Sequence, residues 1–191
     1  MNKPVQARTL KTRAKLLDAA NAVVAEADYE ALRVEEVVSR AGVAKGTVFA
    51  HFRDKDALMD QLIGARALDI LETISAGPQP RTARDMVHAL RPLIDFVTSE
   101  RYVFDIVLRY SGAAGISDIG PIAQSFERQY LLSLQWVSHP DLPVRDDIPL
   151  ELVAEGIGAF LIQAISLKFC ALHGSVSVED RLVPYFEAWL R

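Results

Sequence analysis

Basic residues gather around one short helix that the sequence predicts between residues 45 and 51. A tight turn at residues 41–44 precedes this helix, and Lys45 and Thr47 fall in its first turn. The free backbone N–H groups of a helix N-terminus carry partial positive charge and favour a phosphate group. Further cations lie in the flanking segments, at Lys11, Arg13, Lys15 and Lys55. The pattern favours contact with nucleic-acid phosphates, although a solvated charged face on a helical hairpin would show it too.

Two short helices joined by a glycine-containing turn must position these residues. The hydrophobic spacing predicts helices over residues 34–41 and 45–51, and Gly42 lies directly after the first, where a glycine commonly ends a helix. Val48 and Phe52 are four residues apart and are expected to face the interior. A helix-turn-helix is built in this way and places the start of its second helix against the bases and phosphates of DNA.

The charge of the chain is divided unevenly between its two parts. The 191 residues have a net charge of −4. Residues 1–53 contain nine Lys or Arg and six Asp or Glu, whereas residues 54–191 contain twelve and nineteen. A basic first part and an acidic second part suggest that only the first part meets an anion, with chance clustering as the alternative.

The remaining segments are also predicted to be helical, because strand-like alternation is nearly absent. Helices are expected over residues 9–27, 55–75, 82–97, 100–110, 121–138 and 148–172, and from a capping box at 177–180 to residue 190. Thr9 and Asp54 are the expected N-caps, and Pro92 should bend its helix. The fold class is therefore all-α, with a helix-turn-helix domain at residues 1–53 and a helical ligand-binding and dimerisation domain at residues 54–191.

Residues 41–58, with the sequence Ala-Gly-Val-Ala-Lys-Gly-Thr-Val-Phe-Ala-His-Phe-Arg-Asp-Lys-Asp-Ala-Leu, resemble the DNA-binding signature of the TetR family (TetR/AcrR type). Residues 16–20 and the pair Asp28-Tyr29 fit the same signature, so the resemblance covers about residues 9–60. It implies an all-helical homodimer that binds a palindromic operator in double-stranded DNA. It also implies a repressor that a small-molecule effector releases from the operator.

The resemblance indicates which residues meet DNA and where this chain departs from the pattern. The expected contacts are Arg33, Lys45, Gly46, Thr47, Phe49, His51 and Lys55, with Arg33 and Lys55 on phosphates. Asp28 replaces the usual glycine, and the left-handed conformation that Asp tolerates should keep the turn. Leu32-Arg33 and Ala44 replace capping hydroxyl residues, and Phe49 replaces a tyrosine. Each lost hydroxyl removes one neutral hydrogen bond, of about 1 kcal/mol.

The middle helices mix polar and aromatic groups with apolar residues, which is what an effector cavity needs. The candidate ligand contacts are His88, Tyr102, Asp105, Arg109, Phe126, Gln129, Tyr130 and Gln163. Tyr102, Asp105 and Arg109 share one helix face by their spacing. The apolar surroundings suggest a hydrophobic or amphipathic effector. The alternative is that the aromatics are core residues and that Asp105 and Arg109 form a plain ion pair.

The last two predicted helices are candidates for the dimer contact that the resemblance implies. The first has small residues that allow close approach of another helix, at Ala154, Gly156, Gly158 and Ala159. The second has an apolar stripe, formed by Leu182, Phe186, Trp189 and Leu190. The alternative is that both helices belong to the core of a monomer.

Other chemistry finds little support in the sequence. The four histidines are far apart, so we expect no metal site and no cofactor. Cys170 is expected to be a buried core residue. No apolar run of about 20 residues is found, and we expect a cytoplasmic protein that is not an enzyme. Two other functions stay open: a ligand-sequestering helical protein without operator binding, and an enzyme built on Tyr102, Asp105 and Arg109.

Overall fold

The computed structural model describes residues 3–111 and 119–191, and side chains from residue 7 onward. Every regular element in these ranges is an α-helix, which confirms the all-α class. The helices are α1 (Lys3–Glu26), α2 (Val34–Ala41), α3 (Lys45–His51), α4 (Lys55–Ser75), α5 (Ala83–Val97), α6 (Arg101–Ser111), α7 (Pro121–Val137), α8 (Leu150–Lys168) and α9 (Val178–Trp189).

Two predicted boundaries are wrong. α1 begins at Lys3, so Thr9 lies within the helix and is not its N-cap. α8 ends at Lys168 rather than near residue 172. The chain turns back at this end, because the Gly174 N–H donates to the Cys170 carbonyl at 2.8 Å. A Cβ at Gly174 would lie 2.8 Å from the Lys168 carbonyl oxygen, so the turn needs glycine. The predicted break after Ser111 falls largely outside the described residues.

Asp54 begins α4 as the sequence predicts. Its Oδ1 accepts a hydrogen bond from the Ala57 N–H at 2.8 Å. This backbone hydrogen bond lowers the pKa of the Asp54 carboxyl below its ordinary value of 3.8. Ser177 and Thr82 cap α9 and α5 in the same way, by accepting from the N–H groups of Asp180 and Asp85.

The Asp54 cap should contribute to stability in a pH-dependent way. Because folding lowers this pKa, its contribution is present above about pH 4 and is lost as the pH falls through the folded-state pKa. Asp54→Ala should cost about 1 kcal/mol of unfolding free energy at pH 7. Asp54→Asn keeps a capping oxygen but cannot ionise, so its stability should fall less between pH 5 and pH 3 than that of the wild type. Urea unfolding at three pH values measures both effects, and equal acid sensitivity of the Asp54→Asn variant and the wild type would contradict the assignment.

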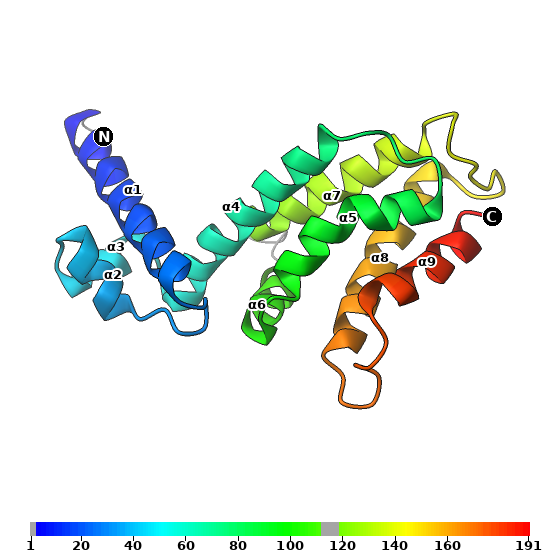
Figure 1. Cartoon of the computed structure of the whole chain (residues 1–191). Coiled ribbons are helices and arrows are strands. Elements are labelled where there is room, and N and C mark those ends of the chain that lie inside the picture. Colours follow the sequence, from blue (N-terminus) through cyan, green and yellow to red (C-terminus); the bar gives the residue numbers. More distant parts are fainter. Residues whose placement is uncertain (1–2, 112–118) are drawn as a thin grey trace.

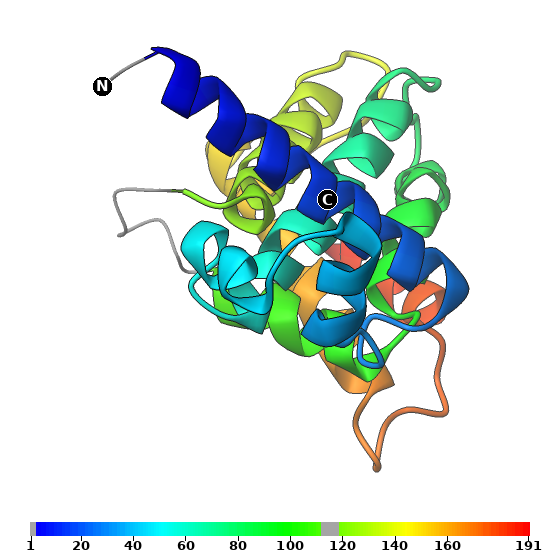
Figure 2. The same ribbon diagram turned by 90° about the vertical axis from the view of Figure 1, so that its left-hand side faces the viewer.

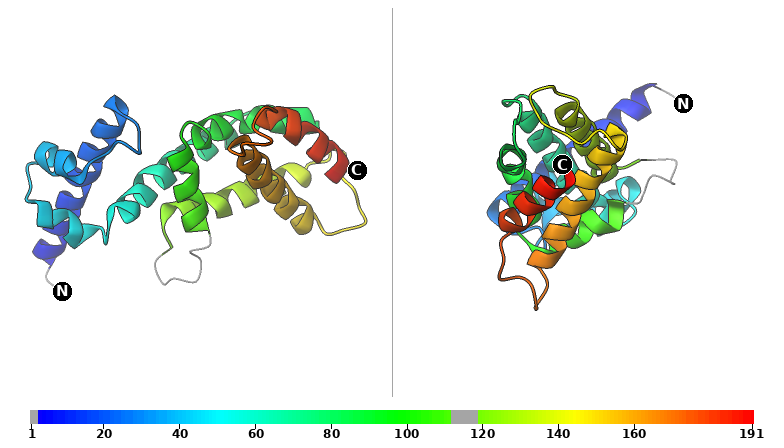
Figure 3. Two further views of the ribbon diagram at one scale, coloured as in Figure 1. Left: turned by 90° about the horizontal axis from the view of Figure 1, so that it is seen from below. Right: turned by 90° about the vertical axis from the view of Figure 1, so that its right-hand side faces the viewer.

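The helices form a small group and a large group joined by one long helix. α1, α2 and α3 lie together at one end, and α4 runs from them into the larger group beside α7 (Figure 1). α8 and α9 lie side by side at the opposite end, as the right-hand view of Figure 3 shows. Seen from the end of the small group, α1 crosses in front of the larger group (Figure 2).

Helix α4 contributes to both hydrophobic cores. Its first half, including Leu58 and Ile63, packs with Leu16 and Val48 of the small group and with part of α6. Its second half, from Ala67 to Ile74, packs in the larger core around α5, α8 and α9. The small helical group is therefore joined to the rest of the molecule by a continuous packed helix.

The first half of α4 also touches the start of α7 very closely. A Cβ added to Gly64 would lie 2.4 Å from the Ile122 backbone nitrogen and 2.6 Å from the Pro121 Cβ. The Oδ1 of buried Asp60 accepts a hydrogen bond from the Ile122 N–H at 3.2 Å. Asp60 thus accepts a hydrogen bond at the start of α7, where backbone N–H groups have no partner within the helix. Gly64 allows the backbones of α4 and α7 to approach each other.

Helix α8 is the most apolar element among the described residues. By length and composition alone, and with a mean hydropathy of 1.6, it could cross a membrane. The expectation from the sequence, which required an apolar run of about 20 residues, was therefore too strict. In this fold α8 packs against α7 and α9, and its Val153 and Ile157 are fully buried. A helix buried in a protein core has the same length and composition, so these two properties are weak evidence for a membrane span.

Candidate DNA-binding face and internal cavity

The turn between α2 and α3 sets the direction of α3. Gly42 has a left-handed backbone, with φ of 66°, and is the only residue with positive φ in the described part of the chain. The Val43 N–H donates to the Val38 carbonyl at 3.1 Å, which closes the end of α2. A Cβ at Gly42 would have open space around it, so glycine is needed here for its backbone conformation.

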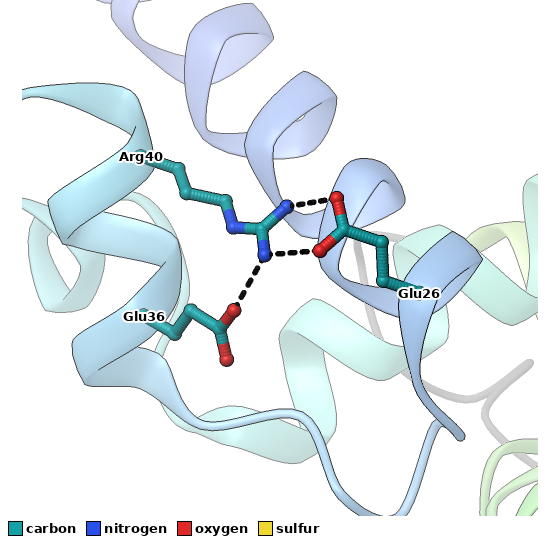
Figure 4. Close-up of polar contacts among 3 residues, drawn as sticks. All are labelled: Glu26, Glu36 and Arg40. Carbon is teal, nitrogen blue, oxygen red and sulfur yellow. Dashed lines mark hydrogen bonds and ion pairs between the residues drawn. The ribbon is translucent and has the colours of Figure 1, made fainter.

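Arg40 ties α2 to the end of α1. Its guanidinium donates to both carboxylate oxygens of Glu26, at 2.7 and 2.6 Å, and to Glu36 at 2.7 Å (Figure 4). Hydrogen bonding from Arg40 lowers the pKa of the Glu26 carboxyl. Exposed ion pairs of this kind add little stability. The bidentate contact between Arg40 and Glu26 does restrict the orientation of α2 relative to α1.

The outer face of α3 is open to solvent. Lys45, Gly46 and Phe49 are exposed, whereas Thr47 and His51 are half-buried and Val48 is buried in the small core. Phe49 leaves 49% of its surface exposed, which is unusual for a large apolar side chain. The Lys45 ammonium lies 2.5 Å from a Glu35 carboxylate oxygen, and both side chains remain more than half exposed. The structure therefore brings all five predicted contacts of this helix to the end of the molecule.

The cationic side chains that flank α3 differ in their contacts. Arg33 is exposed at the N-cap of α2, where it makes no side-chain capping bond. Lys55 donates to the Glu30 carbonyl at 3.0 Å and lies 5.2 Å from the centre of the Tyr102 ring. Burial lowers the pKa of this ammonium. Arg13 is turned inward and donates to the His51 carbonyl and to Gln61, so it holds α1 against α3 and α4.

An apolar cavity of about 50 Å³ lies in the larger helical group. Five helices line it, α4 to α8, through Ala67, Leu71, Leu93, Val97, Val107, Ser125, Phe126, Gln129, Gly158, Leu161, Ile162 and Ile165. Among the described residues its lining contains no charged side chain, and the polar groups there are the Ser125 hydroxyl and the Gln129 amide. Of the predicted ligand contacts, Phe126 and Gln129 line this cavity. Tyr130 lines a neighbouring surface groove between α7 and α8.

The other five predicted ligand contacts lie away from this cavity. His88 and Gln163 are exposed. Tyr102 packs with the small core beside Lys55, because its side of α6 faces the start of α4. The alternative of an Asp105–Arg109 ion pair is wrong as well: Asp105 binds Arg101 at 2.9 Å, and Arg109 binds Asp56 of α4. These three residues share a helix face, as their spacing predicts, but this face meets α4 and solvent.

Comparison with known proteins assigns the family. Residues 16–62 match the model of the bacterial regulatory proteins of the tetR family. An uncharacterized HTH-type transcriptional regulator of Bacillus subtilis, YvdT, is 29% identical over 147 residues, which are 76% of this chain and 71% of that protein. The helix-turn-helix region belongs to the TetR family. The protein is accordingly a transcriptional regulator with a DNA-binding helix-turn-helix.

Solved structures of TetR-family proteins share the fold over nearly the whole chain. Thermus thermophilus FadR, a TetR-family repressor in complex with lauroyl-CoA, has a TM-score of 0.62 at 16% identity and covers 93% of both chains. The complex of SmeT, a Stenotrophomonas maltophilia efflux-pump repressor, with triclosan has a TM-score of 0.55 at 17% identity, covering 94% of this chain and 90% of the other. At these identities the likeness shows the fold alone.

The turn after α1 is built differently from the sequence expectation. Asp28 does not take the left-handed conformation, since no residue other than glycine has positive φ in the described ranges. Instead, the Glu100 carboxylate at the start of α6 accepts from the N–H groups of Tyr29 and Glu30, at 2.9 and 3.1 Å. The Tyr29 ring also packs edge-on against Phe96 of α5. Sequence reasoning missed Glu100 because its partners lie about 70 residues earlier in the chain.

Replacing Glu100 should loosen the contact between the helix-turn-helix and α6. Glu100→Ala leaves the partly buried Tyr29 N–H and the exposed Glu30 N–H without their acceptor, which should cost about 1 kcal/mol of unfolding free energy. The backbone amides of Tyr29 and Glu30 should exchange with deuterium faster than in the wild type. Glu127→Ala, an exposed change on α7, is the control. Unchanged exchange at residues 29–30 in Glu100→Ala would contradict the role given to this carboxylate.

Two small residues of α8 contact other helices of the same chain, as in the alternative that the sequence leaves open. A Cβ on Gly156 would lie 2.3 Å from the Trp189 ring of α9, and one on Gly158 would lie 3.1 Å from the Gln129 Oε1 of α7. Both glycines therefore admit neighbours within the same chain on the side that a Cβ would occupy. The pattern of small residues indicates that another helix approaches α8 closely, but it does not indicate which helix this is.

Proposed function

We propose that this regulator is a cytoplasmic homodimeric repressor, which a small hydrophobic or amphipathic effector releases from a palindromic operator. Residues 1–53 would form the DNA-binding domain, and residues 54–191 the effector-binding and dimerisation domain. The observation that carries the proposal is the exposed outer face of α3, held by the Gly42 turn and the Arg40 bridge.

The exposed face of α3 suits the major groove of DNA. Lys45 and Thr47 stand at the start of the helix, where they would meet base edges and phosphates. Gly46 has open space around its Cα, so a DNA backbone can approach closely. Exposed Phe49 would contact a thymine methyl group, the apolar feature of that groove. His51 would lie at the end of this contact.

Arg33 and Lys55 would bind phosphates beside the groove. The Arg33 side chain is exposed and makes no capping bond in the structure. Lys55 would have to exchange the Glu30 carbonyl for a phosphate oxygen, and its contact with Tyr102 of α6 would change with it. A phosphate would likewise compete with Glu35 for Lys45. Operator binding and the position of α6 would thus influence one another.

The dimer would form through α8 and α9, which lie together at the end away from α3 (Figure 3). Exposed positions on this surface include Leu152, Ala159 and Ala188. A two-fold axis there would bring two copies of α3 to positions about 34 Å apart, one turn of DNA. This spacing is the reason for expecting a palindromic operator.

Effector release would work through helices that face both the cavity and the DNA-binding end. Val107 of α6 and Leu71 of α4 line the cavity. On its other side α6 carries Arg109, which binds Asp56 near the start of α4. A ligand that binds better when these helices move apart would shift the protein away from its DNA-bound arrangement, by its difference in affinity for the two states.

Fluorescence anisotropy on the DNA upstream of the protein's own gene tests the proposal. The labelled fragment and a scrambled fragment are titrated at two salt concentrations. Tight binding with a preference for the native sequence would support an operator-specific regulator. Binding equal to that of scrambled DNA and lost at moderate salt would reflect backbone electrostatics alone. That second result would favour a ligand-sequestering protein. The observation that supports this alternative is that neither α2 nor α3 has a side-chain N-cap hydrogen bond.

A further inference from the structure

We propose that the effector is an uncharged, mainly apolar molecule with a single hydroxyl-type group, which hydrogen-bonds the side-chain amide of Gln129. This inference rests on the proposed effector function and narrows its ligand class. Three observations support it: the lining of the cavity, the surroundings of Gln129, and the size of the space.

The cavity lining excludes charged ligands from its interior. Ten of the twelve lining residues are apolar or glycine, and the remaining two, Ser125 and Gln129, are neutral. A carboxylate, phosphate or ammonium group buried here would lose its water shell without gaining an opposite charge. Such a transfer is strongly unfavourable. The neutral part of a ligand is favoured instead, because it buries apolar surface.

Gln129 is the polar group available to a ligand. Its side chain is almost completely buried, at 8% exposure, and its Nε2 donates to the Ser133 hydroxyl at 2.8 Å. No hydrogen bond to its Oε1 comes from the described residues, and this oxygen lies against Gly158, another lining residue, where an added Cβ would be 3.1 Å from it. The Ser125 hydroxyl already donates to the Ile122 carbonyl at 2.7 Å. A ligand hydroxyl near Gly158 would therefore find its partner in the Gln129 amide.

The size of the cavity implies that a ligand held wholly inside it must enlarge it. The space of about 50 Å³ is about one third of the 150 Å³ apolar cavity known to hold benzene. A compact aromatic ring would thus push apart the helices that line the space, among them α4 and α6. Binding of such a ligand would favour a rearranged state, which is what the proposed release from DNA requires.

Three matched probes test the proposal in the absence of DNA: 4-ethylphenol, 4-ethyltoluene and 4-ethylbenzoate. They share one shape and differ in the group at the end. Isothermal titration of the full chain should show 4-ethylphenol binding about fivefold tighter than 4-ethyltoluene, the effect of one neutral hydrogen bond. The benzoate should bind weakest. A benzoate that binds tightest, equal binding of phenol and toluene, or no binding of any probe would overturn the proposal.

Variants locate the effect at Gln129. In Gln129→Leu the preference for the phenol over the toluene should fall to about one, while 4-ethyltoluene still binds. Gln135→Leu, an exposed change on the same helix, should keep the wild-type preference. Should Gln129→Leu not fold, the wild-type ranking of the three probes still decides. If the protein binds its operator but does not rank the three probes in this order, only the proposed ligand class is wrong. If it binds the phenol but no operator, the proposed repressor function is wrong.

Discussion

Gly64→Ala is expected to lower the free energy of unfolding by about 2–3 kcal/mol. The new methyl group would lie 2.4 Å from the backbone of residues 121–122, so the start of α7 must move away from α4. Alanine has a better helix propensity than glycine, by about 1 kcal/mol, which offsets part of the cost. The same movement would stretch the hydrogen bond from the Ile122 N–H to Asp60.

Thermal unfolding measures this effect, with an expected decrease in Tm of about 5–10 °C for a chain of this length. Gly46→Ala is the matched control, because a Cβ at Gly46 meets no atom within 4 Å. This variant should be as stable as the wild type or slightly more stable. A Gly64→Ala protein that melts at or above the wild-type temperature would show that α4 and α7 separate without cost, contrary to the packing described above.

Lys45→Glu is expected to weaken operator binding by about 100-fold at low salt. The change removes a charge-assisted contact to phosphate and places a carboxylate beside the DNA backbone. It also leaves two carboxylates together, at positions 35 and 45. Because both side chains are largely exposed, this repulsion should change the stability of the fold very little.

Anisotropy over a range of salt concentrations separates the electrostatic loss from unfolding. The slope of log affinity against log salt should fall by at least about one for Lys45→Glu. Lys168→Glu makes the same charge change at the far end of α8, so it should keep the wild-type slope. Equal losses in both variants would mean that net charge, rather than the position of Lys45 on α3, governs the affinity.

The sequence predicts the local structure of this chain well. Gly42, Asp54 and Ser177 end or begin helices as expected, because capping depends on one residue and its neighbours within a turn. The α2–α3 pair was predicted to the residue for the same reason. The end of α8 was missed because apolar residues continue its pattern to position 172, although the helix ends at Lys168 and the chain turns back at Gly174.

The long-range contacts were beyond sequence reasoning. The spacing of Tyr102, Asp105 and Arg109 correctly predicts one helix face, but it cannot show whether that face meets a cavity, solvent or α4. Glu100 gave no local signal at all, since its partners come from the turn after α1. For the cavity, Phe126 and Gln129 were among the candidates. Most of the other lining residues are ordinary apolar side chains that could equally belong to a filled core.

Because the first half of α4 packs in one core with α1 to α3, we expect that the proposed DNA-binding domain of residues 1–53 cannot be exchanged on its own. A chimera that exchanges operator specificity would have to carry the donor chain through Ile63, so that Leu58 and Ile63 keep their partners. It would also have to retain matching groups at Glu100 and Arg109 on α6. We expect a graft cut at residue 53 to combine two mismatched halves of one core, and a cut after residue 63 to leave only the contacts with α6 and Ile122 to be matched.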